Sequence, residues 1–347
     1  MSGSPGDWAA LQAACAAALM DAAGRPALAV GVTPRVAVAV DRGVTLWRYG
    51  PKPAPGSPPP LLIAYSLVNR PYLLDLSADR SLIGALVAAR RTVYLADWGT
   101  PEAADRHRSL ADYVLVHLER AVRAALKDGA QPRLDLAGVC QGGTLALCYA
   151  ALNAATVRRV VTLVTPVDFA TPEDVLGAYA RALDVERLVA LHGNVPGALL
   201  RAGFQSLKLY GNSLGKLLSL VEAGSDPVRV DRLLRTERWI ADSPDHAGRA
   251  FVEFVQFFYR DNRLVNGGLT LGDRAVTLSG LTQPVLNVYA TRDHLVPPAA
   301  ARALKALCRS TRYEEHAFDG GHIGVFLSER AQAEVPAAIV RFLAARD

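Results

Sequence analysis

A short apolar run, a cysteine between glycines and a second apolar run follow one another over residues 134–147. The first run has the composition of a buried β-strand, and the second has that of a helix. Gly138, Cys140 and Gly142 form the pattern G-x-C-x-G, which is a nucleophile elbow with cysteine in place of serine. Glycines on both sides allow neighbouring backbones to pass close to a sharply turned residue. The pattern predicts that the Cys140 thiol projects above the edge of a sheet.

The predicted position of Cys140 also suits a nucleophile. It places the thiol at a helix N-terminus, where unpaired N–H groups and the helix dipole favour the thiolate, the form that attacks. A small buried structural cysteine is the simpler interpretation. Filling a core does not require glycines on both sides of a strand-to-helix turn, however, so we interpret Cys140 as a nucleophile.

Apolar β-rich runs alternate with helical patterns along most of the chain. A hairpin is expected over residues 36–49, and further strands are expected at residues 61–66, 92–96, 133–137, 159–164, 284–290 and 311–318. Helices are expected at residues 8–23, 77–91, 106–127, 141–153, 298–308 and 329–344. This alternation predicts a mostly parallel sheet with helices on both faces, and together with the elbow it predicts an α/β-hydrolase fold.

The alternation stops between residues 170 and 283, where the pattern is helical with glycine and proline interruptions. We therefore expect a catalytic core made of residues 1–169 and 284–347, with an inserted, mainly helical cap at 170–283. The clearest cap helix is predicted at residues 245–261, where aromatic side chains recur at helical spacing. Such a stripe is typical of the core of a cap rather than of substrate contacts.

A thiol nucleophile needs a base and a group that orients or assists the base, and in this fold the chain order is nucleophile, acid, histidine. Cys140, Asp293 and His322 occur in that order. Asp293 follows the strand predicted at 284–290, and His322 lies in a glycine-rich loop after the last strand. Both therefore belong at the same end of the sheet as the elbow, which predicts a catalytic triad.

Other residues compete for these roles. His294, beside Asp293, is the competing base, whereas the remaining histidines lack a suitable position; they are His107, His117, His192, His246 and His316. Asp97 and Asp168 also end strands, and we interpret them as caps or turn residues, although either could replace Asp293 in a related fold.

Two backbone N–H groups are expected to form an oxyanion hole. One is that of Gln141, directly after the nucleophile, and the other comes from the loop after the strand at 61–66, where we choose Val68.

Composition limits the cofactors, partners and location. With 347 residues, of which 51% are hydrophobic, the chain can form one large domain or a domain with an insertion. The net charge of +5 is spread over scattered basic residues, which predicts weak attraction for anionic substrates and no nucleic-acid binding. Four dispersed cysteines suit neither a disulfide framework nor a zinc site, so we expect no metal, no cofactor and a reducing cytoplasm. We also expect no signal peptide and no transmembrane segment.

Several distinct short motifs are spread from about residue 61 to the C-terminus, including the predicted cap. They are NRPY at 69–72, DWG at 97–99, GVCQGG at 138–143, TPVDF at 165–169, NVPG at 194–197, DSPD at 242–245, DHLVP at 293–297 and GGHIG at 320–324. Together they resemble the catalytic subunit of a class III, two-subunit polyhydroxyalkanoate synthase. The family's catalytic Cys, Asp and His fall on Cys140, Asp293 and His322. The short length points to the partner-requiring branch, and Gln141 after the cysteine favours class III over class IV.

The resemblance implies a function and a set of partners. The chain is expected to polymerise (R)-3-hydroxyacyl-CoA, with 3-hydroxybutyryl-CoA as the expected monomer, and to release CoA through a thioester on Cys140. His322 would activate Cys140, and Asp293 would help to activate the attacking 3-hydroxyl, directly or through His322. The resemblance also implies a second synthase subunit, a growing polyester granule in the cytoplasm with the enzyme at its surface, and a homodimer or higher assembly.

Two other interpretations stay open at this point. A Cys-dependent α/β hydrolase of the thioesterase or dienelactone-hydrolase kind shares the elbow, acid and histidine, but it must admit water, which a polymerase must exclude. A catalytically silent granule-coating or partner-binding homologue is the second alternative, and the intact Cys/Asp/His set argues against it.

Overall fold

The structure is a computed structural model that describes residues 13, 28–54, 56–206 and 226–345. The helix predicted at residues 8–23 lies outside this part of the chain, apart from residue 13. None of the described helices is long and apolar enough to cross a membrane.

An eight-stranded sheet forms the centre of the molecule, with the strand order β1-β2-β6-β3-β7-β8-β11-β12. The strands are β1 (Arg35–Asp41), β2 (Val44–Tyr49), β3 (Leu61–Ala64), β6 (Val93–Asp97), β7 (Leu134–Val139), β8 (Val157–Leu163), β11 (Val285–Ala290) and β12 (Tyr313–Phe318). The β1–β2 hairpin joins the sheet antiparallel at one edge, and all other neighbouring pairs are parallel. Every residue of β3 and β7 is buried, as parallel strands covered on both faces require.

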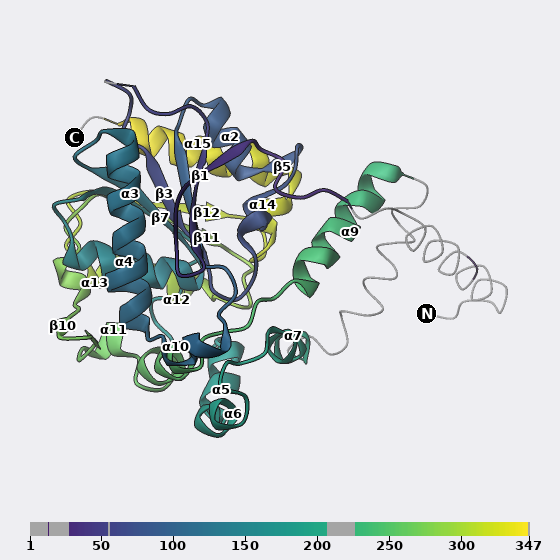
Figure 1. The fold of residues 1–347 in the computed structure, drawn as a ribbon, viewed down its shortest axis with the longest axis vertical. Helices are drawn as coiled ribbons and strands as arrows, with labels where there is room; N and C mark the ends of the chain where they lie inside the picture. The colour runs from purple at the N-terminus through teal and green to yellow at the C-terminus, as the bar shows by residue number, and fades with distance from the viewer. Residues whose placement is uncertain (1–12, 14–27, 55, 207–225, 346–347) are drawn as a thin grey trace.

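Helices pack on both faces of this sheet, which confirms the predicted fold class (Figure 1). One apolar core joins the sheet to α3 (Glu119–Gly129) and α4 (Gln141–Leu152). A second core joins the other face to α2 (Leu82–Ala88) and α15 (Glu329–Ala344). The sheet thus has a buried helix layer on each side, and its strand ends remain for the functional site.

Three predicted helices have other boundaries in the structure. The helix expected at 77–91 starts only at Leu82, because Ser81 caps it through Gly84 N–H while short strands β4 (Asp75–Ser77) and β5 (Arg80–Ser81) precede it. The helix expected at 106–127 begins with a π-helical segment, η3 (Asp112–Leu118), before α3. The helix expected at 298–308 is divided into α12 (Pro298–Arg302) and α13 (Leu304–Leu307).

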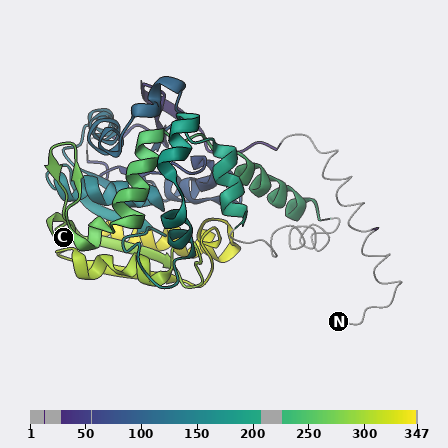
Figure 2. The ribbon, with the colours of Figure 1, turned by 90° about the horizontal axis from the view of Figure 1, so that it is seen from below.

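The segment between β8 and β11 is mainly helical and adds no strand to the eight-stranded sheet within its described residues. Its helices are α5 (Val175–Ala182), α6 (Val185–His192), α7 (Gly197–Ser206), α9 (Pro227–Ala241), α10 (Gly248–Phe254), the π-helical η4 (Val255–Arg260) and α11 (Arg263–Asn266). Seen from below, helices of this segment lie across the front of the molecule (Figure 2). The division into a core and a cap stays a prediction.

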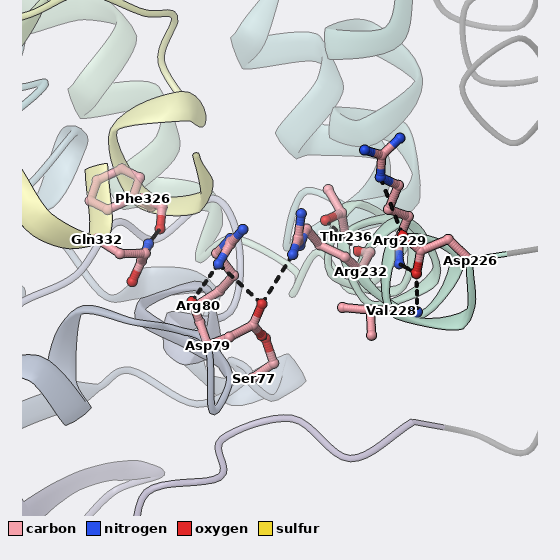
Figure 3. Close-up of polar contacts among 10 residues, drawn as sticks. All are labelled: Ser77, Asp79, Arg80, Asp226, Val228, Arg229, Arg232, Thr236, Phe326 and Gln332. Carbon is pink, nitrogen blue, oxygen red and sulfur yellow. Dashed lines mark hydrogen bonds and ion pairs between the residues drawn. The ribbon is translucent and has the colours of Figure 1, made fainter. Parts of the chain in front are cut away.

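Helix α9 reaches away from the sheet (Figure 1), and an ion pair joins it to the β4–β5 turn (Figure 3). Asp79 Oδ2 lies 3.1 Å from Arg232 Nη2 and 3.0 Å from Arg80 Nη1. At the other end of α9, Trp239 Nε1 donates to the carbonyl oxygen of Arg70. These contacts fix α9 beside the loop that follows β3.

Candidate active site

Cys140 lies between β7 and α4 in the strained conformation expected of an elbow. Its φ is 51° and its ψ is −126°, values that a non-glycine residue adopts only when its surroundings enforce them. Its N–H donates to the carbonyl oxygen of Leu163 on the neighbouring strand, and its own carbonyl accepts from Gly143 N–H at 2.8 Å. The sheet and the helix therefore hold the turn from both sides, with the thiol half-buried at its apex.

The glycines of the elbow are required by close packing. A Cβ on Gly138 would lie 2.3 Å from Gly143 Cα, and a Cβ on Gly142 would lie 2.2 Å from the carbonyl oxygen of Tyr65. The structure adds Gly143 to the predicted pair, since a Cβ there would lie 1.9 Å from Thr165 Oγ1.

Asp293 and His322 meet beyond the ends of β11 and β12. Nδ1 of His322 lies 2.7 Å from Oδ2 of Asp293, and both residues are buried. The other carboxylate oxygen accepts from the backbone N–H groups of Leu295 and Val296 at 2.9 and 3.0 Å. The loop thus fixes the carboxylate, and the carboxylate orients the imidazole. This contact belongs to His322 and not to its predicted competitor His294.

The imidazole of His322 also lies within electrostatic range of Cys140. Burial lowers the pKa of His322, but the Cys140 and Asp293 charges and the hydrogen bond to Asp293 outweigh it and raise this pKa above its ordinary value. Because Nδ1 faces Asp293, Nε2 is the nitrogen left for the thiol. The structure therefore brings the three predicted residues together in an arrangement that suits a thiolate–imidazolium pair.

The two predicted oxyanion donors differ in their surroundings. Gln141 is the first residue of α4, so its N–H has no acceptor within the helix. The N–H of Val68 donates to Ser66 Oγ at 3.1 Å. An oxyanion at Val68 would therefore have to take the place of the Ser66 hydroxyl.

Two tyrosines near the thiol were not predicted from the sequence. Burial raises the pKa values of Tyr65 and Tyr259, and the nearby Cys140 charge raises them further. Tyr259 belongs to the aromatic stripe, and its ring packs edge-on against Phe169 with 5.0 Å between centroids. Tyr259 differs from the phenylalanines of that stripe by its hydroxyl group. This hydroxyl is the only sequence signal that could have indicated a role beyond packing.

Asp97 and Asp168 act as turn residues in the structure. Asp97 Oδ1 accepts from Gly99 N–H, whereas Asp168 Oδ1 accepts from Ala170 N–H and Asn262 Nδ2. No group of three or more His, Cys, Asp or Glu side chains within the described ranges is arranged to hold a metal ion.

Comparison with known proteins shows similarity to one fold family and to one group of enzymes. The family model for the alpha/beta hydrolase fold matches residues 59–329. Poly(3-hydroxyalkanoate) polymerase subunit PhaC of Allochromatium vinosum is 46% identical over 91% of this chain and 90% of its own length. The protein of the same name from Synechocystis sp. is 40% identical over 91% of this chain and 86% of its own. A solved hydrolase from Pseudomonas aeruginosa covers 91% of this chain and 99% of its own, with a TM-score of 0.55 at 16% identity, which shows the fold alone.

Proposed function

Because this chain belongs to the poly(3-hydroxyalkanoate) polymerase family, with its α/β-hydrolase fold, we propose that it carries out polymerisation through a covalent thioester on Cys140. It is an acyltransferase that joins hydroxyacyl groups from CoA thioesters into polyhydroxyalkanoate. The covalent mechanism is supported by the position of the half-buried Cys140 at the elbow, near the buried His322–Asp293 pair. By the same proposal the monomer is an (R)-3-hydroxyacyl-CoA such as 3-hydroxybutyryl-CoA, and no cofactor takes part.

Acylation starts from the thiolate of Cys140. The sulfur attacks the carbonyl carbon of the hydroxyacyl-CoA, a new C–S bond forms, and the C–S bond to CoA breaks. The departing CoA thiolate takes the proton that His322 holds. Asp293 keeps the imidazole in place during this exchange, because its carboxylate is itself anchored by two backbone N–H groups.

The negative charge that develops on the carbonyl oxygen needs donors beside the elbow. The N–H of Gln141 lies directly after the nucleophile, and the N–H of Val68 lies on the loop after β3, where Ser66 Oγ now accepts from it. We assign the two groups to the oxyanion hole, with the substrate oxygen replacing the Ser66 hydroxyl at Val68.

Chain growth follows when the 3-hydroxyl of another hydroxyacyl group attacks the Cys140 thioester. Asp293 helps to remove the hydroxyl proton, directly or through His322. The new C–O bond replaces the C–S bond to Cys140, which leaves as a thiolate. Forming a thioester from another thioester costs little free energy, whereas passing the acyl group to oxygen is downhill. A cysteine nucleophile therefore suits polymerisation better than a serine, which would form the oxygen ester too early.

We further assign a second subunit and a polyester granule as partners. The similar proteins are named as polymerase subunits, which supports a partner. Large apolar side chains are exposed on α5, α6 and α7, among them Val175, Leu191 and Leu199. They supply an apolar surface on the helical segment for a partner or a granule.

In this proposal the helical segment covers Cys140, and the partner raises activity by binding an opened state better than a closed one. Assembly as a homodimer or larger belongs to the same proposal.

The direct test follows CoA release from 3-hydroxybutyryl-CoA by the purified chain, with and without a candidate second subunit. The product is examined for insoluble polyester. Activity with a gain on adding the subunit supports the proposal, and release of free 3-hydroxybutyrate in place of polymer would assign the chain to the hydrolases. Full activity of the chain alone, with no gain from the subunit, would contradict the proposal that a partner activates the enzyme by opening the helical segment.

A further inference from the structure

Two of the sequence motifs meet where α9 ends. The motif NRPY at 69–72 lies in the loop after β3, and the motif DSPD at 242–245 follows α9 directly. Asn69 Nδ2 donates to Ser243 Oγ at 3.0 Å, which joins the two motifs. Neither motif belongs to the triad, so their contact needs an explanation of its own.

The carboxylate of Asp242 binds two side chains of the loop. Its Oδ1 accepts from Arg70 Nε at 3.2 Å, and its Oδ2 accepts from the Tyr72 hydroxyl at 3.1 Å. Burial and the Asp242 charge raise the pKa of Tyr72, so this hydroxyl keeps the proton that it donates. Pro71 lies between these two residues, and Arg70 has the extended backbone that a following proline favours. One carboxylate therefore holds both sides of a stiff turn.

The guanidinium of Arg70 is also bound to the loop after β6. Its Nη1 donates to the carbonyl oxygen of Gly99 at 3.1 Å, and its Nη2 donates to Thr100 Oγ1 at 2.6 Å. With Nε on Asp242, all three nitrogens of the guanidinium have protein partners. This arrangement indicates that Arg70 joins three segments of the chain.

The main chain of the loop is held on both sides of Val68. On one side, Leu67 N–H donates to Oε1 of Gln141 at 3.1 Å, in a buried contact. On the other side, the carbonyl oxygen of Arg70 accepts from Nε1 of the buried Trp239 at 2.8 Å. The first anchor belongs to the elbow and the second belongs to α9. Val68 therefore lies between the catalytic core and the helical segment.

These contacts restrict the predicted oxyanion donor, because only Val68 and Asn69 lie between the two anchored residues. We propose that Asp242 and Trp239 are positioning residues, which hold the loop so that the Val68 N–H meets the carbonyl oxygen of the bound thioester. Loss of the anchor on α9 would free residues 69–72 and move this donor. The inference rests on the proposed function, since it requires acylation of Cys140.

The position of these residues gives the helical segment a part in the chemistry. Trp239 and Asp242 lie in the predicted cap, whereas Val68 and Arg70 lie in the core. Docking of the helical segment and completion of the oxyanion hole are then one event. An opened helical segment would admit substrate, and acylation would wait until these contacts form again.

The test compares two reactions of the same thiol in Asp242→Ala. Acylation by 3-hydroxybutyryl-CoA forms an oxyanion, and it is followed by rapid quenching and intact-protein mass spectrometry. Alkylation by iodoacetamide forms no oxyanion, so it reports on the thiolate and on access to it. We expect acylation to fall about 10- to 100-fold while alkylation stays within about twofold of wild type.

Two further variants separate positioning from a general loss of structure. Asp242→Asn keeps an oxygen that can accept from the loop, so it should recover most of the acylation rate. Trp239→Phe keeps an aromatic ring and removes the N–H that binds the Arg70 carbonyl. It should show the same split between acylation and alkylation as Asp242→Ala.

Arg232→Gln is the matched control. It breaks the ion pair of α9 with Asp79, about two turns before Trp239 on the same helix (Figure 3). Because this ion pair does not involve the loop that carries Val68, acylation should stay within about twofold of wild type. An equal fall in Arg232→Gln would mean that any loosening of α9 has the same effect, and it would overturn the inference.

A double variant tests whether Asp242 acts through Arg70. Arg70→Gln combined with Asp242→Ala should lose little more acylation rate than Arg70→Gln alone, because the two residues act as one unit. Multiplied losses in the double variant, or unchanged acylation in Asp242→Ala, would overturn this inference and leave the proposed function intact. Absence of any acyl adduct on Cys140 in the wild type would overturn the proposed function and this inference with it.

Discussion

Nδ1 of His322 lies 2.7 Å from Oδ2 of Asp293, and this contact orients the imidazole that we propose as the base. The carboxylate takes one ring nitrogen and leaves the other for the thiol. The second carboxylate oxygen accepts from two backbone N–H groups, which hold the carboxylate in this orientation. The base is therefore fixed by the β11 and β12 loops before any substrate arrives.

Replacing the nucleophile should stop the reaction without unfolding the protein. We expect Cys140→Ala to abolish CoA release, because no other side chain at the elbow apex can form the thioester. The smaller side chain keeps the backbone of the turn and the glycine packing around it. Stopped-flow detection of free CoA and far-UV circular dichroism check the two halves of this prediction, and turnover within tenfold of wild type would contradict it.

Replacing the base should slow every reaction of the thiol. His322→Gln removes the imidazole whose charge interacts with Cys140, so less thiolate is present near neutral pH and iodoacetamide alkylation slows. His294→Gln is the matched control, since His294 neighbours Asp293 in sequence. A slower alkylation in His294→Gln together with an unchanged rate in His322→Gln would reverse our assignment.

Crowding at the elbow should make Gly143→Ala destabilising. The added Cβ would fall 1.9 Å from Thr165 Oγ1, so α4 and the loop after β8 must move apart, and we expect a loss of about 1–3 kcal/mol in the free energy of unfolding. Gly324→Ala is the control, because its Cβ would meet no atom within 4 Å. Urea unfolding of both variants measures the difference, and equal midpoints would show that the elbow tolerates a side chain there.

The buried ring of His246 should make the protein sensitive to acid. Its folded pKa of about 4 lies below the unfolded value near 6.5, so the unfolded chain binds the proton first as the pH falls. Stability from this group is fully present above pH 6.5 and is lost progressively toward pH 4, by an amount on the order of 2–3 kcal/mol. His246→Gln should flatten this part of the profile of unfolding free energy against pH. An unchanged slope would show that the buried His246 ring is not the cause of the acid sensitivity.

Local patterns and chain order were enough to predict the elbow and the meeting of Asp293 and His322 at the same end of the sheet. Glycines around Cys140, apolar strands and the late glycine-rich loop of His322 are all visible within a few residues of sequence. The start of α2 was predicted wrongly because Ser81 and Asp75 form a local network with Thr33, which lies in a distant part of the chain. His246 was set aside for the same reason. It lines one cavity with Leu67 and Gln141, which lie in segments that no local pattern relates to it.

The trapped acyl-enzyme of Asp293→Asn tests the covalent polymerase mechanism most directly. In the proposed mechanism Asp293 also serves the attacking 3-hydroxyl, so acylation of Cys140 should survive while chain extension fails. Mixing this variant with 3-hydroxybutyryl-CoA should release CoA roughly stoichiometric with enzyme and then stall. Intact-protein and peptide mass spectrometry should then find a short acyl chain on Cys140. Equal loss of the burst and of steady turnover, with no adduct on Cys140, would contradict the mechanism and limit Asp293 to orienting His322.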